Sequence, residues 1–327
     1  MFKGEKVFED EWPVKYLFQK SYKKTKDLVV VFSAFSALGQ PPKYNFIRTL
    51  EEFDCNKLFI LDDFGCRATY YMCKKRDFTI ERSVINLINH IIKENEITNV
   101  ISCGSSKGGA AAIYYGIKYG FSNIIAASPQ YLIGDYLLKQ TNSHNIVDYM
   151  SGSSEEEDLL FLNNIIPDML TKTSNKPKLF IHLGKYEPHY KNHVLPLLKK
   201  LEETSIHYDL DLGEYSKHSD VAKFFPELLK QKIREVLNYP LVSITQSLEG
   251  ECILGLSCEF AIVTDSDSDK VAWYLYHDSK KIEEAKYSFN KRFNIDIKET
   301  GKYSLKVFAI NVLGNKVSKY SKDIIAK

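Results

Sequence analysis

The stretch VISCGSSKGGAAAIY, residues 100–114, joins a short apolar run to an alanine-rich segment through a glycine-rich turn. Its centre fits the pattern G-x-S-x-G, which places a serine on a tight turn between a strand and a helix. Such a turn leaves room only for small residues two positions before and after the serine. Gly104 and Gly108 meet this requirement around Ser106, whereas a turn centred on Ser105 would put a cysteine and a lysine there. The stretch therefore predicts a strand–turn–helix unit with Ser106 as a nucleophile at its bend.

The same turn could instead bind a phosphate group, as many strand-to-helix turns do. The sequence contains neither G-x-x-x-x-G-K-[ST] nor G-x-G-x-x-G, so we favour the nucleophile. A helix that begins at Lys107 directs its first backbone N–H groups at the site, and the Lys107 N–H is expected to stabilise an oxyanion. The second donor is expected from the loop after the first core strand, as the backbone N–H of Ala34 or Phe35.

Apolar runs rich in β-branched residues recur along the first two thirds of the chain and are typical of strands covered on both faces. They occupy residues 28–32, 57–61, 99–103, 123–127 and 178–183. Segments with apolar residues three or four positions apart, as on one face of a helix, occupy residues 79–94, 110–119, 194–203 and 221–237. This alternation predicts an α/β fold, a doubly wound parallel sheet of the α/β-hydrolase kind.

Two regions depart from that alternation. Residues 129–177 contain no clear strand and include the acidic stretch SGSSEEED, so we expect either a lid-like insertion over the active site or a disordered acidic loop. After residue 239 the pattern changes to short alternating segments separated by turns such as DSDSD and NVLGN, which predicts a small antiparallel β-sandwich. We therefore expect a catalytic domain over residues 1–239 and a fibronectin- or Ig-like sandwich over residues 240–327.

A catalytic serine needs a base, and the base needs an orienting acid; in this fold the acid precedes the histidine in the chain. His218 lies after a predicted strand at residues 206–212 and just before the last predicted helix, which is where the base is expected. Glu187 follows the preceding strand and is the expected acid. The neighbouring His189 leaves open the alternative that this loop binds substrate.

Further polar residues are expected to contact the substrate. Asp62 and Asp63 follow the second core strand, at the sheet edge where open α/β folds bind ligands. They could hold sugar hydroxyls, or they could close a turn through side-chain hydrogen bonds to the backbone, and the sequence leaves both open. Ser105, beside the nucleophile, is also expected to contact the substrate.

The composition excludes several classes of function. The 327 residues carry a formal net charge of +2, which gives no indication of nucleic acid or an anionic membrane as a partner. The six cysteines form no CxxC pair and no metal-ligand spacing with histidine, so we expect no bound metal. The sequence shows neither a signal peptide nor an apolar window of membrane-spanning length, which predicts a reducing, cytoplasmic location, including the inner face of the membrane.

The SSKGG turn, the SAF segment after the first strand, the DDFG turn and the KHSD loop together give the chain a family resemblance. It resembles the α/β-hydrolase-fold proteins of bacterial capsule and surface-glycan loci over roughly residues 27–237. These include capsule O-acetyltransferases and the accessory-secretion-system protein that acetylates glycans on serine-rich adhesins. The resemblance implies that Ser106, Glu187 and His218 form a triad, with glutamate in place of the commoner aspartate.

The resemblance also implies a reaction. Such proteins commonly move an acetyl group from acetyl-CoA to a sugar hydroxyl, so we expect acetyl-CoA as co-substrate, no permanently bound cofactor, and a capsular or surface polysaccharide as acceptor. The C-terminal sandwich resembles appended fibronectin-like modules, which implies contact with the polysaccharide or with capsule-assembly proteins. A carbohydrate acetyl esterase with the same triad, or a non-catalytic scaffold of a glycan-assembly or export complex, are the alternatives.

Overall fold

The computed structural model describes residues 2–327, which form two compact units. One unit comprises the chain up to Thr49 and Cys55–Leu229, and the other comprises Leu50–Asp54 and Lys230–Lys327. We expected the division near residue 239, which follows the last helix, whereas the units divide within that helix. The short segment at residues 50–54 belongs to the second unit because the ring of Phe53 packs edge-on against that of Tyr239, with 5.2 Å between centroids.

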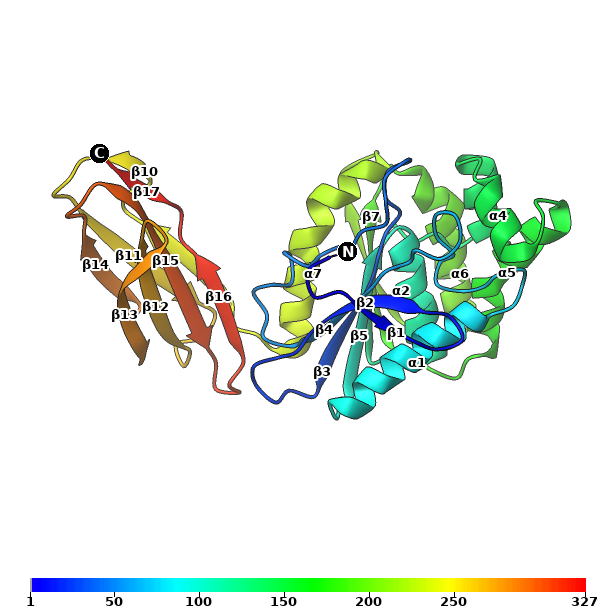
Figure 1. Ribbon diagram of the computed structural model, residues 1–327, viewed down its shortest axis with the longest axis horizontal. Helices are drawn as coiled ribbons and strands as arrows, with labels where there is room; N and C mark the ends of the chain where they lie inside the picture. Colours follow the sequence, from blue (N-terminus) through cyan, green and yellow to red (C-terminus); the bar gives the residue numbers. More distant parts are fainter. Residues whose placement is uncertain (1) are drawn as a thin grey trace. The chain divides into compact units, whose positions relative to one another are not determined.

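A mixed sheet forms the centre of the first unit (Figure 1). Within residues 2–327 it has eight strands in the order β1-β2-β4-β3-β5-β6-β7-β8. Their bounds are β1 Lys6–Phe8, β2 Val14–Gln19, β3 Asp27–Phe32, β4 Asn56–Ile60, β5 Asn99–Ser105, β6 Asn123–Ala127, β7 Lys178–Gly184 and β8 Tyr208–Gly213. All neighbouring strands from β4 to β8 are parallel, whereas β1 and β2 add to one edge in the antiparallel sense.

The buried strands explain why the apolar runs predict this sheet. β4 is buried along its whole length, and β3 and β5 are buried after their first residue. Helices cover the two faces, and Figure 1 shows α7 on one side and α1 and α2 on the other. The main helices are α1 Thr79–Glu94, α2 Lys107–Lys118, α6 Leu195–Glu203 and α7 Val221–Leu237. The predicted doubly wound α/β fold is confirmed; the antiparallel pair β1–β2 was not predicted.

The insertion at residues 129–177 is helical instead of a disordered acidic loop. It contains α3 Ile133–Asp135, the π-helical turn η1 Tyr136–Gln140, α4 His144–Ser151 and α5 Glu156–Lys172. The acidic residues occupy the first turn of α5, where negative charge is favourable, and Arg76 forms ion pairs with Glu157 and Asp158 at 2.8 and 2.9 Å. Two short helical turns lie outside the insertion, η2 Tyr190–Val194 and η3 His218–Asp220.

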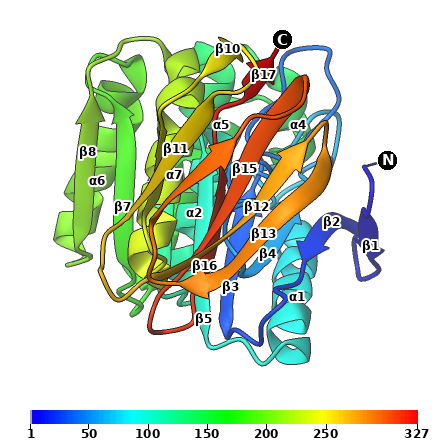
Figure 2. The ribbon, with the colours of Figure 1, turned by 90° about the vertical axis from the view of Figure 1, so that its left-hand side faces the viewer.

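The second unit contains two β-sheets of mostly antiparallel strands, which confirms the predicted β-sandwich class (Figure 2). One sheet has the order β10-β17-β15-β12-β13, with β16 paired to β15, and the other has the order β14-β11-β9. Their bounds are β9 Val242–Gln246, β10 Gly250–Cys252, β11 Ser257–Thr264, β12 Lys270–His277, β13 Lys280–Ser288, β14 Arg292–Asp296, β15 Gly301–Ile310, β16 Lys316–Tyr320 and β17 Ile324–Ala326. From Tyr303 onward, every second residue of β15 is buried, the period expected of a half-covered strand.

Among the residues that the structure describes, no helix is long and apolar enough to cross a membrane.

Candidate active site

Ser106 lies at the bend between β5 and α2, as the glycine pattern predicts. Its backbone angles, φ 56° and ψ −120°, fall in a strained region for a residue with a side chain, which costs about 1–3 kcal/mol. A Cβ atom added to Gly104 would collide with the backbone of Gly108, and one added to Gly108 would collide with the carbonyl oxygen of Phe32. The two glycines therefore permit the close approach of strand and helix that holds Ser106 in this conformation.

The structure brings Ser106, His218 and Glu187 together. The Ser106 hydroxyl lies 2.9 Å from Nε2 of His218, and Nδ1 of His218 lies 2.8 Å from Oε2 of Glu187. With Glu187 ionised, Nδ1 donates to the carboxylate, which leaves Nε2 as acceptor for the serine proton. The arrangement can thus accept a proton from Ser106 and stabilise the resulting imidazolium.

The Glu187 carboxylate is buried and fixed by two further donors. Its Oε1 accepts hydrogen bonds from the Ser128 hydroxyl at 2.9 Å and from the backbone N–H of Gly184 at 2.8 Å. Gly184 is the last residue of β7 and Ser128 directly follows β6, so the carboxyl ends of two parallel strands hold the acid. These bonds leave Oε2 directed at His218.

A second imidazole lies flat against His218. The ring of His189 stacks on it with 3.9 Å between centroids and 4° between planes. Burial, reinforced by the charges that His218 and His193 carry when protonated, lowers the pKa of His189 to about 2, so this ring is neutral at physiological pH. Burial also lowers the pKa of His193, to about 4, although the charge of Asp135 opposes this effect. A neutral partner supports the His218 ring without adding a like charge beside it.

Gln130 and Tyr70 are site residues that the sequence analysis missed. Both are fully buried; Nε2 of Gln130 donates to the Ser106 hydroxyl oxygen at 2.6 Å, and the Tyr70 hydroxyl donates to Oε1 of Gln130 at 2.6 Å. Ser106 thus accepts one hydrogen bond while it offers its proton to His218. The signal available in the sequence was the position of Gln130, three residues after β6, at the same sheet edge as the nucleophile.

The oxyanion donors expected from the sequence occupy suitable elements. Lys107 is the first residue of α2, whose first-turn N–H groups have no partner within the helix. The Ala34 N–H instead donates to Oδ1 of Asn45 at 2.9 Å, so it is engaged in this structure. The N–H of Phe35 has no hydrogen-bond partner within residues 2–327, which favours Phe35 as the second donor.

Of the two alternatives left open for Asp62, sugar binding and closure of a turn, the structure fits the second, because Asp62 is buried. Its buried carboxylate accepts hydrogen bonds from the backbone N–H and hydroxyl of Thr69 and forms an ion pair with the Lys107 ammonium at 2.7 Å. The turn alternative therefore describes Asp62. Asp63 forms an ion pair with Lys15 at 2.6 Å, and Ser105 is buried as the last residue of β5.

Three potential metal ligands lie in the site. Glu187, His189 and His218 each place one ligating atom within 4.8 Å of the others. Because the two imidazole planes are nearly parallel and 3.9 Å apart at their centroids, their lone pairs lie in separate parallel planes and cannot both point directly at one ion. The hydrogen bond between His218 and Glu187 also occupies two of these groups. The donor set therefore fits proton transfer better than metal binding.

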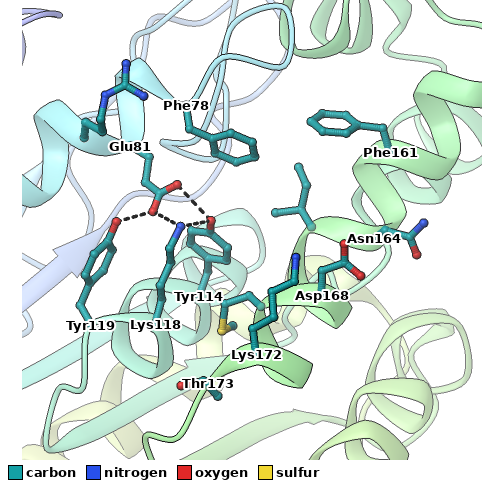
Figure 3. Close-up of a pocket in the computed structure, with 13 residues that line it drawn as sticks. Phe78, Glu81, Tyr114, Lys118, Tyr119, Phe161, Asn164, Asp168, Lys172 and Thr173 are labelled. Atoms are coloured by element: carbon teal, nitrogen blue, oxygen red, sulfur yellow. Dashed lines mark hydrogen bonds and ion pairs between the residues drawn. The ribbon is translucent and has the colours of Figure 1, made fainter.

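A cavity of about 810 Å³ lies away from this site, between α1, α2 and α5 (Figure 3). Its polar interior is occupied by Glu81, which accepts hydrogen bonds from Tyr114 and Tyr119 and forms an ion pair with Lys118 at 2.6 Å. The α2 residues that line it are 8 to 12 positions beyond Ser106, about 12–18 Å along the helix. Because its central carboxylate is satisfied internally, this cavity is not the site of the chemistry.

Comparison with known proteins supports this fold. The sequence matches no protein-family model and no curated protein. The structure is similar to that of the capsule O-acetyltransferase of Neisseria meningitidis serogroup A in complex with CoA, with 25% sequence identity, a TM-score of 0.61, and coverage of 71% of this chain and 96% of that one. It is also similar to the glycosylation-associated Gap123 complex of Streptococcus agalactiae, with 17% identity, a TM-score of 0.60, and coverage of 72% and 46%.

Serine hydrolases share the same architecture. The fluorophosphonate-binding serine hydrolase FphF of Staphylococcus aureus has 12% identity and a TM-score of 0.54, over 72% of this chain and 97% of that one. At these identities the hydrolase likeness concerns the fold alone. The chain thus has the α/β-hydrolase fold, and its structural neighbours include the capsule O-acetyltransferase group that its sequence motifs resemble.

Proposed function

We propose that this protein is a serine O-acetyltransferase that transfers an acetyl group from acetyl-CoA to a hydroxyl of a bacterial capsular or surface polysaccharide. The observation that carries the proposal is the continuous hydrogen-bonded series from Ser106 through His218 to Glu187. The similarity to a capsule O-acetyltransferase in complex with CoA supports the choice of donor and acceptor classes. Because acetyl-CoA is the donor, we place the reaction in the cytoplasm.

In the first half-reaction, Ser106 attacks the thioester carbonyl carbon while its proton moves to Nε2 of His218. The N–H groups of Lys107 and Phe35 stabilise the tetrahedral oxyanion. The C–S bond then breaks, and the thiol of CoA leaves with the proton from His218. Glu187 stabilises the imidazolium throughout and is not itself protonated.

In the second half-reaction, His218 accepts the proton of a sugar hydroxyl, whose oxygen attacks the acetyl-serine. The ester bond to Ser106 breaks, and the serine oxygen recovers a proton from His218. Gln130 donates to this oxygen in the resting enzyme and stabilises the charge that develops on it as it leaves. The product is an O-acetylated sugar, and the resting site is restored.

The second candidate is a carbohydrate acetyl esterase, because the hydrogen-bonded series from Ser106 to Glu187 serves ester hydrolysis equally well. In that case an acetylated sugar replaces acetyl-CoA as the donor, so that the sugar hydroxyl leaves with the proton from His218 in the first half-reaction, and water attacks the acetyl-serine to release acetate in the second. The chain is incubated with acetyl-CoA and capsular oligosaccharides, and the products are weighed by mass spectrometry. Sugar acetylation that is lost in Ser106→Ala supports the transferase, whereas acetate release without sugar acetylation supports the esterase. A wild-type chain that does neither, and that fluorophosphonates do not label, supports a scaffold.

The second unit, which contains the β-sandwich, has a separate role in this proposal. We assign it contact with the polysaccharide or with capsule-assembly proteins, on the basis of its resemblance to fibronectin-like modules. Deletion of residues 240–327 should then weaken acetylation of long polysaccharide more than acetylation of short oligosaccharides. Equal losses for both lengths would contradict this assignment.

A further inference from the structure

Arg67 carries a positive charge that no carboxylate neutralises. Its guanidinium lies over the ring of Phe35, 4.9 Å from the centroid, and Nη2 donates to the carbonyl oxygen of Ser36 at 2.9 Å. Within residues 2–327, no carboxylate lies within ion-pair distance of it. Four other arginines do form ion pairs with carboxylates: Arg76, Arg82, Arg234 and Arg292. Most of the N–H donors of Arg67 therefore remain available.

The aromatic side chains of Phe35 and Tyr136 connect Arg67 to the nucleophile. The Phe35 ring beneath it also contacts the rings of Tyr70 and Tyr136, with centroids 5.6 and 6.3 Å away. Burial raises the pKa of Tyr136, and the charge of Arg67 and hydrogen bonding to Ser106 oppose that rise. Arg67 also lies in the loop after β4, at the carboxyl edge of the sheet, where ligands of α/β proteins bind.

We propose that Arg67 forms an anion subsite beside Ser106, which binds a phosphate or carboxylate group of a substrate. A planar guanidinium with free N–H groups matches such groups in a bidentate geometry, and a partly buried position strengthens the bond. Phe35 and the Ser36 carbonyl hold the guanidinium in place before the substrate arrives, which reduces the entropy lost on binding. The inference rests on the proposed function, because it takes Ser106 as the reacting group.

Two substrates could carry the anion. An acidic sugar of the acceptor would place its phosphate or carboxylate near the hydroxyl that attacks the acetyl-serine. The diphosphate of CoA would instead bind Arg67 from the donor side. In both cases Arg67 determines specificity, because a neutral analogue would leave the guanidinium without its partner.

Binding is measured by calorimetry or NMR titration in a Ser106→Ala chain, so that turnover does not interfere. The acceptor probes are glucose 1-phosphate and glucuronate, with glucose as the neutral control, and the donor probes are CoA and uncharged pantetheine. Arg67→Gln should weaken binding of the relevant anion about 10- to 100-fold and leave the neutral analogue unchanged. Arg67→Lys should restore part of the affinity, because it keeps the positive charge but loses the bidentate geometry of the guanidinium. Arg292→Gln, an exposed arginine of the second unit, is the matched control.

The outcomes are distinct. Weakened binding of the sugar anions alone assigns the subsite to the acceptor, and weakened binding of CoA alone assigns it to the donor. Unchanged affinity for all anions, or no measurable binding of any of them to the parent chain, overturns the proposal. Should Arg67→Gln not fold, as judged by its melting curve, Arg67→Lys alone carries the comparison. Failure of the proposed function would appear separately, as a wild-type chain that fluorophosphonates do not label.

Discussion

Replacement of Lys107 by methionine should destabilise the first unit strongly, although Met is close to Lys in volume. The Lys107 ammonium lies 2.7 Å from the Asp62 carboxylate, and the side chains are 1% and 0% exposed. Lys107→Met leaves that carboxylate buried with only its hydrogen bonds from Thr69. Removal of one partner of a buried pair costs about 3–5 kcal/mol, a large share of the usual stability of a domain.

Substitution of the other partner, Asp62, should lower the stability less. Burial lowers the pKa of Lys107, and the neighbouring Asp62 opposes that effect. In Asp62→Asn the amine can therefore lose its proton and remain buried as a neutral group, so we expect a loss of about 1–3 kcal/mol. The double variant should be more stable than Lys107→Met alone, because it contains no unpaired buried charge.

Urea unfolding measures these differences. Trp12 and Trp273 are the two tryptophans of the chain, and Trp12 belongs to the first unit, so its fluorescence reports on that unit in a Trp273→Phe background. The four chains of the double-mutant cycle are compared at one temperature and pH. A loss below about 1 kcal/mol in Lys107→Met, or additive losses in the double variant, would refute the reasoning from burial.

Three other substitutions test the site and its surroundings. Glu187→Gln should lower the rate of fluorophosphonate labelling about 10³- to 10⁴-fold, because an amide does not stabilise the His218 imidazolium. Glu249→Gln in the second unit is the control. Equal labelling rates in the wild type and in Glu187→Gln would contradict the triad. Gly108→Ala should cost about 3 kcal/mol and reduce labelling, since its Cβ would collide with a backbone carbonyl oxygen of β3; an unchanged melting temperature would count against it. The pKa of His193 is about 4 in the folded chain, against an ordinary 6.5, so the unfolded chain binds more protons between these two pH values. The free energy of unfolding should therefore fall as the pH drops through that window, by at most about 1.4 kcal/mol per pH unit. His193→Gln should flatten this pH dependence in urea titrations, and a slope identical to that of the wild type would contradict the prediction.

Much of the fold could be predicted because local patterns determine it. β3, β4 and β5 are continuous apolar runs, and such runs need cover on both faces. The glycines around Ser106 indicate the tight turn on their own, because their spacing reflects a steric requirement between adjacent segments. The antiparallel pair β1–β2 escaped prediction because β1 has only three residues and is mostly exposed.

The composition of the site was less accessible to sequence analysis. Chain order and loop position were enough to select His218 and Glu187. His218 lies within hydrogen-bonding distance of both Glu187 and Ser106, in the sense expected. Gln130 and the Lys107–Asp62 pair depend on contacts between segments 24 and 45 residues apart. No local pattern encodes such contacts, and a lysine after the nucleophile gave no indication that its side chain is buried.

The most direct test of the account is to trap the acetyl group on the protein. The chain is mixed with acetyl-CoA in the absence of an acceptor, quenched in acid within milliseconds to seconds, digested and analysed by mass spectrometry. We predict one acetyl group on the peptide that contains Ser106, lost when an oligosaccharide acceptor is added and absent in His218→Ala. Acetylated sugar formed by a Ser106→Ala chain at the wild-type rate would contradict the covalent mechanism.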